Sequence, residues 1–199
     1  ERVAPELKGH DLEAYVDYWL LLGRLPDQLD PAIAREFLAK HERTYIAEKL
    51  RSDWLKVLGK KQQWAEFDAE YPKIVAPDQE LVCYALQSRR ARSDASMLDD
   101  AMPLWLTLLE PPEPCYPVLE ALIWEKRVIA DEVWARVRRQ FEANKIAAAR
   151  YTTNYLPTSQ TPTSAQLEAV IDRPMPTLAK LPANWSDKRL GRELAALAI

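Results

Sequence analysis

Apolar residues recur every three or four positions along most of this 199-residue chain. The two clearest runs are Ile46, Leu50, Trp54 and Leu58, and Ile129, Val133, Val137 and Phe141. This spacing places apolar side chains on one face of an α-helix, whereas a half-buried strand would alternate apolar and polar residues. No convincing alternating run of five or more residues bounded by turns is present. The sequence therefore predicts an all-α protein.

Residues that start and stop helices separate the apolar runs. Asp30-Pro31 is typical of an N-cap followed by a proline in the first turn, and Asp78 can cap the next start in the same way. Gly23 and Gly59 each follow an apolar run, as a left-handed residue at a helix C-terminus would. These signals place the helix boundaries.

Helices are predicted near residues 11–22, 31–40, 43–58, 61–70, 79–91, 95–109, 116–125, 130–142 and 145–155. Pro103 predicts a kink in the sixth of these, or a start near residue 101. Short connections between helices of this length are typical of antiparallel pairs, here recurring every roughly 33–41 residues. We therefore expect a right-handed α-superhelix, or solenoid, of antiparallel hairpins that is tetratricopeptide-like but degenerate. An ordinary α-helical globule is the alternative.

The character of the sequence changes after residue 156, which predicts three parts. Residues 1–156 form the hairpin array. Residues 157–185 are rich in proline and are expected to be extended chain packed on the array, with a short helix near 164–172 capped by Thr163 or Ser164. Trp185 is expected to cover the helical surface. Residues 186–199 begin a further hairpin that has no partner helix, so the chain is expected to be truncated.

Composition excludes several classes of function. With 27 Lys+Arg against 30 Asp+Glu, the net charge of −3 argues against a nucleic-acid binder. No apolar run approaches the length of about 18 residues that a membrane span needs. Only four glycines are present and neither phosphate-loop motif occurs, so no cofactor is expected. The chain begins at Glu1 without a leader, which suggests a mature or excised segment.

Few residues are candidates for chemistry. Two histidines, His10 and His41, leave little for a metal site, and no metal is expected. Cys83 and Cys115 lie 32 positions apart, each near the start of a predicted helix. They could be two unrelated buried thiols, a metal or redox pair, or a disulfide. A metal or redox role has no support, because there is no CxxC motif and no histidine near either residue.

The charged and aromatic residues are interpreted as structural. Carboxylates such as Glu120, Glu125 and Asp131-Glu132 lie on helix faces, and a catalytic carboxyl needs a special environment that none of them reveals. Two basic clusters are interpreted as the solvated sides of helices: Arg89, Arg90 and Arg92, and Arg136, Arg138 and Arg139. The seven tryptophans are assigned mainly to core packing. No catalytic residue is predicted.

Four stretches carry a resemblance to a known family. Residues 36–72, EFLAKHERTYIAEKLRSDWLKVLGKKQQWAEFDAEYP, are similar to a hairpin of the form LRxxWLxxLGxxxxWxxFxxxYP. Residues 12–19 (LEAYVDYW) precede it, and residues 81–109 and 131–157 follow it. This pattern resembles the N-terminal superhelical segment, the U-domain, of soluble lytic murein transglycosylases of the Slt type.

The resemblance implies a function for the whole parent protein. Members of this family are periplasmic, and some pair cysteines at positions matching Cys83 and Cys115, so the resemblance favours the disulfide. The helical segment forms part of a ring, which a linker domain and a lysozyme-like catalytic domain close around peptidoglycan glycan strands. One glutamate there cleaves the bond between N-acetylmuramic acid and N-acetylglucosamine, leaving a 1,6-anhydro product. The catalytic strings E-S-x-x-x-P, G-L-M-Q and A-Y-N-A-G do not occur in this chain.

The leading hypothesis is therefore a non-catalytic scaffold segment of a periplasmic lytic transglycosylase, with its signal peptide removed. The main alternative is a tetratricopeptide-like adaptor that binds a protein partner in its groove. Free thiols at Cys83 and Cys115 would favour the adaptor. A carbohydrate-binding module acting alone is a third hypothesis, which requires exposed aromatic residues.

Overall fold

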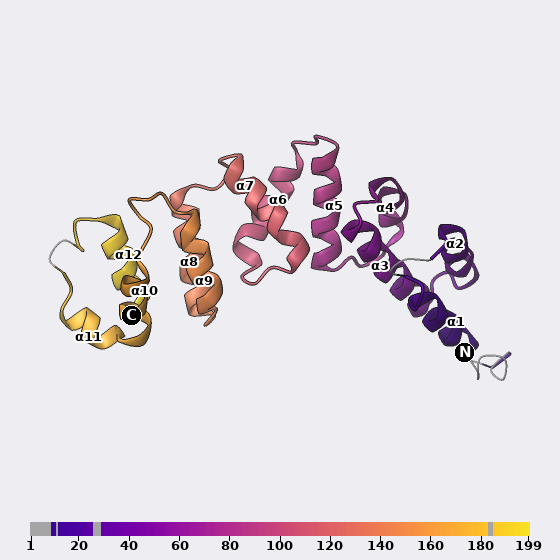
Figure 1. Ribbon diagram of the computed structural model, residues 1–199, viewed down its shortest axis with the longest axis horizontal. Helices are drawn as coiled ribbons and strands as arrows, with labels where there is room; N and C mark the ends of the chain where they lie inside the picture. The colour runs from indigo at the N-terminus through magenta and orange to yellow at the C-terminus, as the bar shows by residue number, and fades with distance from the viewer. Residues whose placement is uncertain (1–8, 11, 26–28, 183–184) are drawn as a thin grey trace. The chain divides into compact units, whose positions relative to one another are not determined.

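A computed structural model of the chain describes residues 9–10, 12–25, 29–182 and 185–199. These residues contain twelve α-helices and no strand, which confirms the all-α prediction (Figure 1). Nowhere in this described part is a helix both long and apolar enough to cross a membrane. The predicted first residue of the first helix, residue 11, lies outside the described residues.

The chain divides into two compact units, residues 1–97 with 112–115 and residues 98–111 with 116–199. The first unit contains α1 (Glu13–Leu22), α2 (Pro31–Lys40), α3 (Tyr45–Lys60), α4 (Trp64–Glu70) and α5 (Gln79–Ala91). The second contains α6 (Met97–Thr107) apart from its first residue, α7 (Tyr116–Trp124), α8 (Ala130–Glu142), α9 (Ile146–Thr152), α10 (Ser164–Asp172), α11 (Pro174–Ala179) and α12 (Arg189–Leu197).

Each unit is built from helices that follow one another in sequence and pack together. In the first unit, α3 contacts α1, α2, α4 and α5, and its Leu50 and Leu55 are fully buried. In the second unit, α8 pairs with α9, and α10 packs against α11 and α12 around Leu167 and Leu194. Burying one such leucine contributes about 1.5–3 kcal/mol. Packing between neighbouring helices therefore supplies the stability that such short helices lack alone.

The helix starts agree with the predicted caps. Asp30 Oδ1 accepts from the Ala32 N–H at 2.8 Å with Pro31 in the first turn, and Asp78 Oδ1 accepts from the Leu81 N–H at 3.0 Å. Thr163 caps α10, and the Gln166 side chain accepts from the Thr163 N–H in return at 2.9 Å. Such caps pair N–H groups that the helix leaves free.

The left-handed conformation predicted for the two glycines is wrong, although α1 does end at Leu22, directly before Gly23. Gly59 lies inside α3, and Gly23 has a right-handed φ of −64°. The left-handed positions that follow helices are instead non-glycine residues: Arg43, Gln62, Ser93, Lys126 and Asn144. Their local hydrogen bonds, rather than a missing side chain, hold the left-handed conformation.

One turn recurs at four of these positions. After α7, Lys126 N–H donates to Ile123 O at 3.0 Å and Arg127 N–H donates to Leu122 O at 2.8 Å. The same pair of bonds ends α3, α5 and α8. This is the Schellman arrangement, which pairs the last carbonyls of a helix. Each of these turns leads directly into the next helix. The feature that repeats along the chain is therefore this helix–turn–helix geometry, and not a fixed sequence motif.

Gly59 has a different role, which is to let α5 approach α3. A Cβ at this position would lie 2.4 Å from Cγ of Tyr84, which is closer than packed carbon atoms can come. Gly191 does the same for Trp185, whose Cα would lie 2.3 Å from an added Cβ. Trp185 packs with the core cluster of α10 and α12.

The proline-rich stretch departs from expectation in one place. The helix predicted near 164–172 is α10, but α11 is helical where extended chain was predicted. Pro174 is tolerated because it occupies the first turn, where its missing N–H has no partner in any case. In α6, Pro103 lies inside the helix, so the alternative start near residue 101 is wrong. The division into 1–156, 157–185 and 186–199 stays a prediction.

The structure joins Cys83 of α5 to Cys115 in the 3₁₀ turn Glu113–Cys115 as a disulfide. The two Cα atoms are 5.0 Å apart and both side chains are fully buried. Gln87 Nε2 donates to Pro114 O at 2.6 Å beside the bridge. Closing a loop of this length stabilises the folded state by about 3–4 kcal/mol on the chain-entropy account.

Replacing Lys126 by glycine should stabilise the protein. Lys126 is exposed with a φ of 53°, and glycine adopts this conformation without strain, so we expect a gain of about 0.5–1 kcal/mol in the free energy of unfolding. The control is Glu168→Gly, an exposed position within α10, which should cost about 1 kcal/mol. Thermal melts followed by circular dichroism measure both. A lower melting temperature for Lys126→Gly would contradict this account of the turn.

Replacing Gly59 by alanine should destabilise the protein by about 1–3 kcal/mol, because the Tyr84 ring occupies the space of the new methyl group. Gly23→Ala is the matched control, since its added Cβ has no neighbour nearer than 3.7 Å and its backbone is right-handed. This control should be neutral or stabilising by up to about 1 kcal/mol. Urea unfolding of both variants provides the comparison, and equal effects would show that Gly59 is not a packing requirement.

Candidate functional site

The residues that the sequence analysis considered for chemistry lie in different parts of the structure and do not form one site. His10 Nδ1 accepts from the Leu12 N–H at 3.1 Å, and His41 follows α2 with its ring 4.5 Å from that of Phe37. Glu132 caps α8 by accepting from the Ile129 N–H at 2.7 Å, and Asp131 pairs with Arg189. Across the described ranges, no three metal-ligating side chains come together.

Five of the seven tryptophans are either buried or exposed, and Trp64 and Trp185 are partly buried. Trp54, Trp105 and Trp134 are buried, as the assignment to core packing predicts. Trp19 and Trp124 are exposed, so that assignment is wrong for them. Their positions in α1 and at the end of α7 leave their rings in solvent.

The two basic clusters differ in how their arginines are placed: some form ion pairs, but one is buried. Arg92 pairs with Asp68 at 2.7 Å and Arg138 pairs with Glu193, which fits the surface role predicted for them. Arg136 is only 3% exposed, so its assignment to a solvated face is wrong. It projects from α8 between Val133 and Val137, on the apolar side of the helix.

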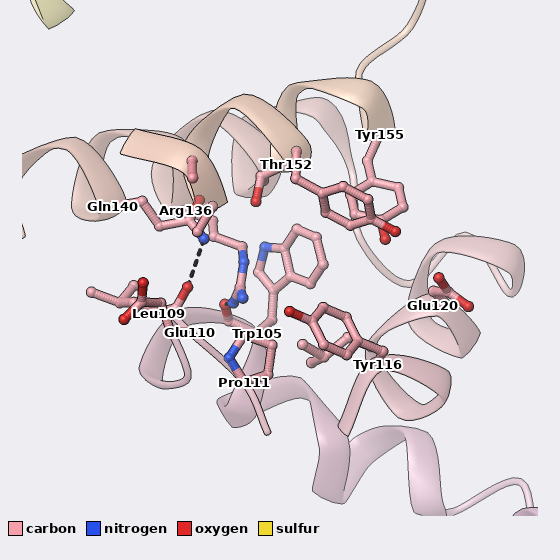
Figure 2. Close-up of a pocket in the computed structure, with 14 residues that line it drawn as sticks. Trp105, Leu109, Glu110, Pro111, Tyr116, Glu120, Arg136, Gln140, Thr152 and Tyr155 are labelled. Atoms are coloured by element: carbon pink, nitrogen blue, oxygen red, sulfur yellow. Dashed lines mark hydrogen bonds between the residues drawn. The ribbon is translucent and has the colours of Figure 1, made fainter. Parts of the chain in front are cut away.

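Arg136 lies at a pocket within the second unit, a hollow of about 660 Å³ (Figure 2). Its walls come from α7, α8, α9, the 3₁₀ turn Thr153–Tyr155 and the end of α6 with the residues after it. Pockets of this volume are typical of sites for small ligands. The pocket therefore is the candidate functional site.

Arg136 and Gln140 shape the floor of the pocket by holding the end of α6. Arg136 Nη1 donates to Trp105 O and its Nη2 donates to Leu108 O. Gln140 Nε2 donates to Leu109 O at 2.8 Å, the bond that is dashed in Figure 2. The last carbonyls of a helix carry partial negative charge, so a cation is favourable there. Two residues one turn apart on α8 thereby fix the position of the chain as it leaves α6.

The charge of Arg136 is unusually placed. Its Cζ lies 4.9 Å from the centre of the Trp105 ring, and its hydrogen bonds go to backbone carbonyls. Burial lowers the pKa of Arg136 to about 10, which still leaves the guanidinium charged at neutral pH. Backbone carbonyls and an aromatic face thus stabilise a buried positive charge.

Four aromatic rings line the pocket in sequence from its buried end to its rim. Trp105 meets Tyr155 at 6.1 Å, Tyr155 meets Tyr151 at 5.7 Å and Tyr151 meets Tyr116 at 6.3 Å, each edge to face. Burial raises the pKa of Tyr155 above its usual range, and a hydrogen bond with Tyr151 adds to this. The outer rings, Tyr116 and Tyr151, are 41% and 49% exposed. Solvent therefore reaches their faces.

Two carboxylates complete the lining. Glu110 forms an ion pair with Lys145 at 2.7 Å, and Glu120 is half-buried among the tyrosines. Both signs of charge therefore occur around one aromatic hollow, which suits binding through hydrogen bonds and ring contacts. Sequence reasoning named Glu120 and Arg136 but joined neither to a site. The signal for Arg136 and Gln140 was their i, i+4 spacing on the same side of α8 as the valines.

Comparisons with known proteins give matches of structure only. No family model matches the sequence, and no curated protein matches it. The structure matches the 70-kDa soluble lytic transglycosylase, solved in complex with bulgecin A, with a TM-score of 0.77 and 18% identity. It also matches an inactive variant of the lytic transglycosylase Slt from Pseudomonas aeruginosa with a TM-score of 0.73 and 23% identity.

The matches cover nearly all of this chain but only part of each solved protein. Each covers 99% of this chain but 32% of the solved protein, so the chain spans about a third of their length. The predicted likeness to the Slt type is confirmed at the level of the fold. This chain has the helical superhelix fold of Slt-type soluble lytic transglycosylases.

Proposed function

We propose that this chain is the non-catalytic helical segment of a periplasmic lytic transglycosylase that cleaves peptidoglycan. One observation carries the proposal: the fold likeness runs over 99% of this chain and over 32% of two lytic transglycosylases. The remaining length of those proteins leaves room for a catalytic domain. In this proposal the segment forms one arc of a ring around a glycan strand.

The chemistry of the parent protein would lie outside this chain. Lytic cleavage needs a carboxylic acid that protonates the glycosidic oxygen and a base that then activates the C6 hydroxyl of the muramoyl residue. In the family, one glutamate within E-S-x-x-x-P does both, and this string does not occur here. The segment would therefore contribute shape and binding, not bond cleavage.

The disulfide supports the periplasmic part of the proposal. Structural disulfides persist in oxidising compartments such as the bacterial periplasm and are rare in the cytosol. Cys83 and Cys115 are both fully buried, as a structural bridge would be. A cytosolic tetratricopeptide-like adaptor would not be expected to hold this bond, and the adaptor hypothesis is not favoured.

The proposal predicts a difference in activity between this chain and the whole protein. The 199-residue chain should release no 1,6-anhydromuropeptides from murein sacculi, as measured by chromatography and mass spectrometry. The coding DNA should continue into a frame containing E-S-x-x-x-P and G-L-M-Q, and the protein encoded by that longer frame should release them. Release by the chain alone would overturn the scaffold role. A gene without any catalytic domain would overturn the assignment to a lytic transglycosylase.

A second prediction concerns the cysteines in the native cell. After acid quenching and alkylation under denaturing conditions, neither Cys83 nor Cys115 should be labelled, because both are in the disulfide. Reduction before alkylation should label both and serves as the control. Two labelled cysteines without reduction would argue for a reducing compartment and for the adaptor.

A further inference from the structure

We propose that the pocket of the second unit binds N-acetylated amino sugars and thereby holds a glycan. The inference rests on the proposed function for the source of the sugar, and on the pocket itself for the chemistry. Three features of the pocket carry it: a rim of exposed tyrosines, a polar floor with unused hydrogen-bonding capacity, and a balance of charges.

The tyrosine rim provides a surface for a sugar ring. Tyr116 and Tyr151 contribute two adjacent rings to the lining of the pocket, and Figure 2 shows the ring of Tyr116 facing the hollow. The face of an aromatic ring carries partial negative charge, so it attracts the slightly positive C–H groups on the face of a pyranose. Edge-to-face packing with Tyr155 holds Tyr151 in place before any ligand arrives.

The floor has one unpaired acceptor and spare donors. Gln140 is almost fully buried, and its Oε1 has no hydrogen-bond partner, although its Nε2 is bonded to Leu109 O. A buried polar atom left unpaired costs about 1–3 kcal/mol, so a donor that reaches it is favourable. Arg136, one turn earlier, has five N–H groups and donates hydrogen bonds to two backbone carbonyls.

An acetamido group matches this floor. Its N–H can donate to Gln140 Oε1, which has no other partner, and its C=O can accept from an N–H of the Arg136 guanidinium. A simple hexose has hydroxyls but no such rigid pair. The volume of about 660 Å³ is sufficient for a short oligosaccharide rather than a single small ion.

The charges around the pocket disfavour a polyanion. Arg136 contributes one buried positive charge, while Glu110 and Glu120 contribute carboxylates and Lys145 neutralises the first of them. A phosphate-rich ligand would face these carboxylates at close range. A ligand rich in hydroxyl and amide groups can instead donate to the glutamates and accept from the cation.

The test uses two oligosaccharides that differ only in the group at issue. Chitotetraose and cellotetraose share the same linkage and ring, and only chitotetraose has acetamido groups. In isothermal titration with the 199-residue chain, chitotetraose should bind about tenfold or more tightly than cellotetraose, since an acetamido group that pairs the buried amide is worth that much. No binding of chitotetraose, or equal binding of the two, overturns the proposal.

Variants connect the binding to the pocket. Tyr116→Ala and Tyr151→Ala should each weaken chitotetraose binding by about fivefold or more, because each removes one ring of the rim. Tyr45→Ala removes an exposed tyrosine of the first unit and is the matched control, with affinity unchanged. Gln140→Met should reduce the preference for chitotetraose over cellotetraose. Circular dichroism verifies folding, and the exposed tyrosine variants remain decisive if Gln140→Met unfolds.

Three further outcomes test the identity of the ligand and separate this inference from the proposed function. Binding of a stem peptide lacking sugar, weakened by the same tyrosine variants, would assign the pocket to peptides and overturn the glycan assignment. If chitotetraose fails to bind while the longer protein releases 1,6-anhydromuropeptides, only the pocket assignment fails. If chitotetraose binds in the pocket and no longer protein with that activity exists, the scaffold proposal fails and the sugar site stands.

Discussion

Every helix ends with carbonyl groups that it cannot pair by itself, and the way these groups are paired organises this molecule. The helices are short, from 6 to 16 residues, so helix ends are frequent along the chain. Four ends close through left-handed turns that lead at once into the next helix. The end of α6 is different, because its carbonyls are paired by Arg136 and Gln140 from α8. The two side chains that close this end are also the floor of the pocket.

The parts of the fold that depend on local chemistry could be predicted. Asp30, Asp78 and Thr163 cap helices through bonds within three residues of themselves, so the sequence is enough to locate them. The apolar spacing located α8 and α10 at their observed ends. The ends of α2 and α5 were also predicted where they occur. The left-handed residues after the helices could not be identified, because a turn held by its own hydrogen bonds does not require glycine and can contain a residue such as Lys126.

The site was largely beyond prediction for a related reason. A charged residue beside other charged residues suggests a solvated face, and Arg138 follows that rule by pairing with Glu193. Arg136 does not, because its partners are carbonyls of α6, which no pattern within α8 reveals. Gly59 was noticed but misinterpreted, since its packing against Tyr84 involves another helix. At 18–23% identity, what the matched structures share with this chain is the fold.

The disulfide has a consequence for the connectivity of the molecule. Residues 98–111 belong to the second unit, whereas the residues before them and residues 112–115 belong to the first unit. The Cys83–Cys115 disulfide joins the two stretches of the first unit on either side of residues 98–111. Residues 98–111 therefore lie within the covalent loop that the disulfide closes between Cys83 and Cys115. A protease that cuts once within residues 98–111 would leave both fragments in one covalent molecule. The disulfide would therefore keep the two parts of the chain in one molecule even after the backbone between them is cut.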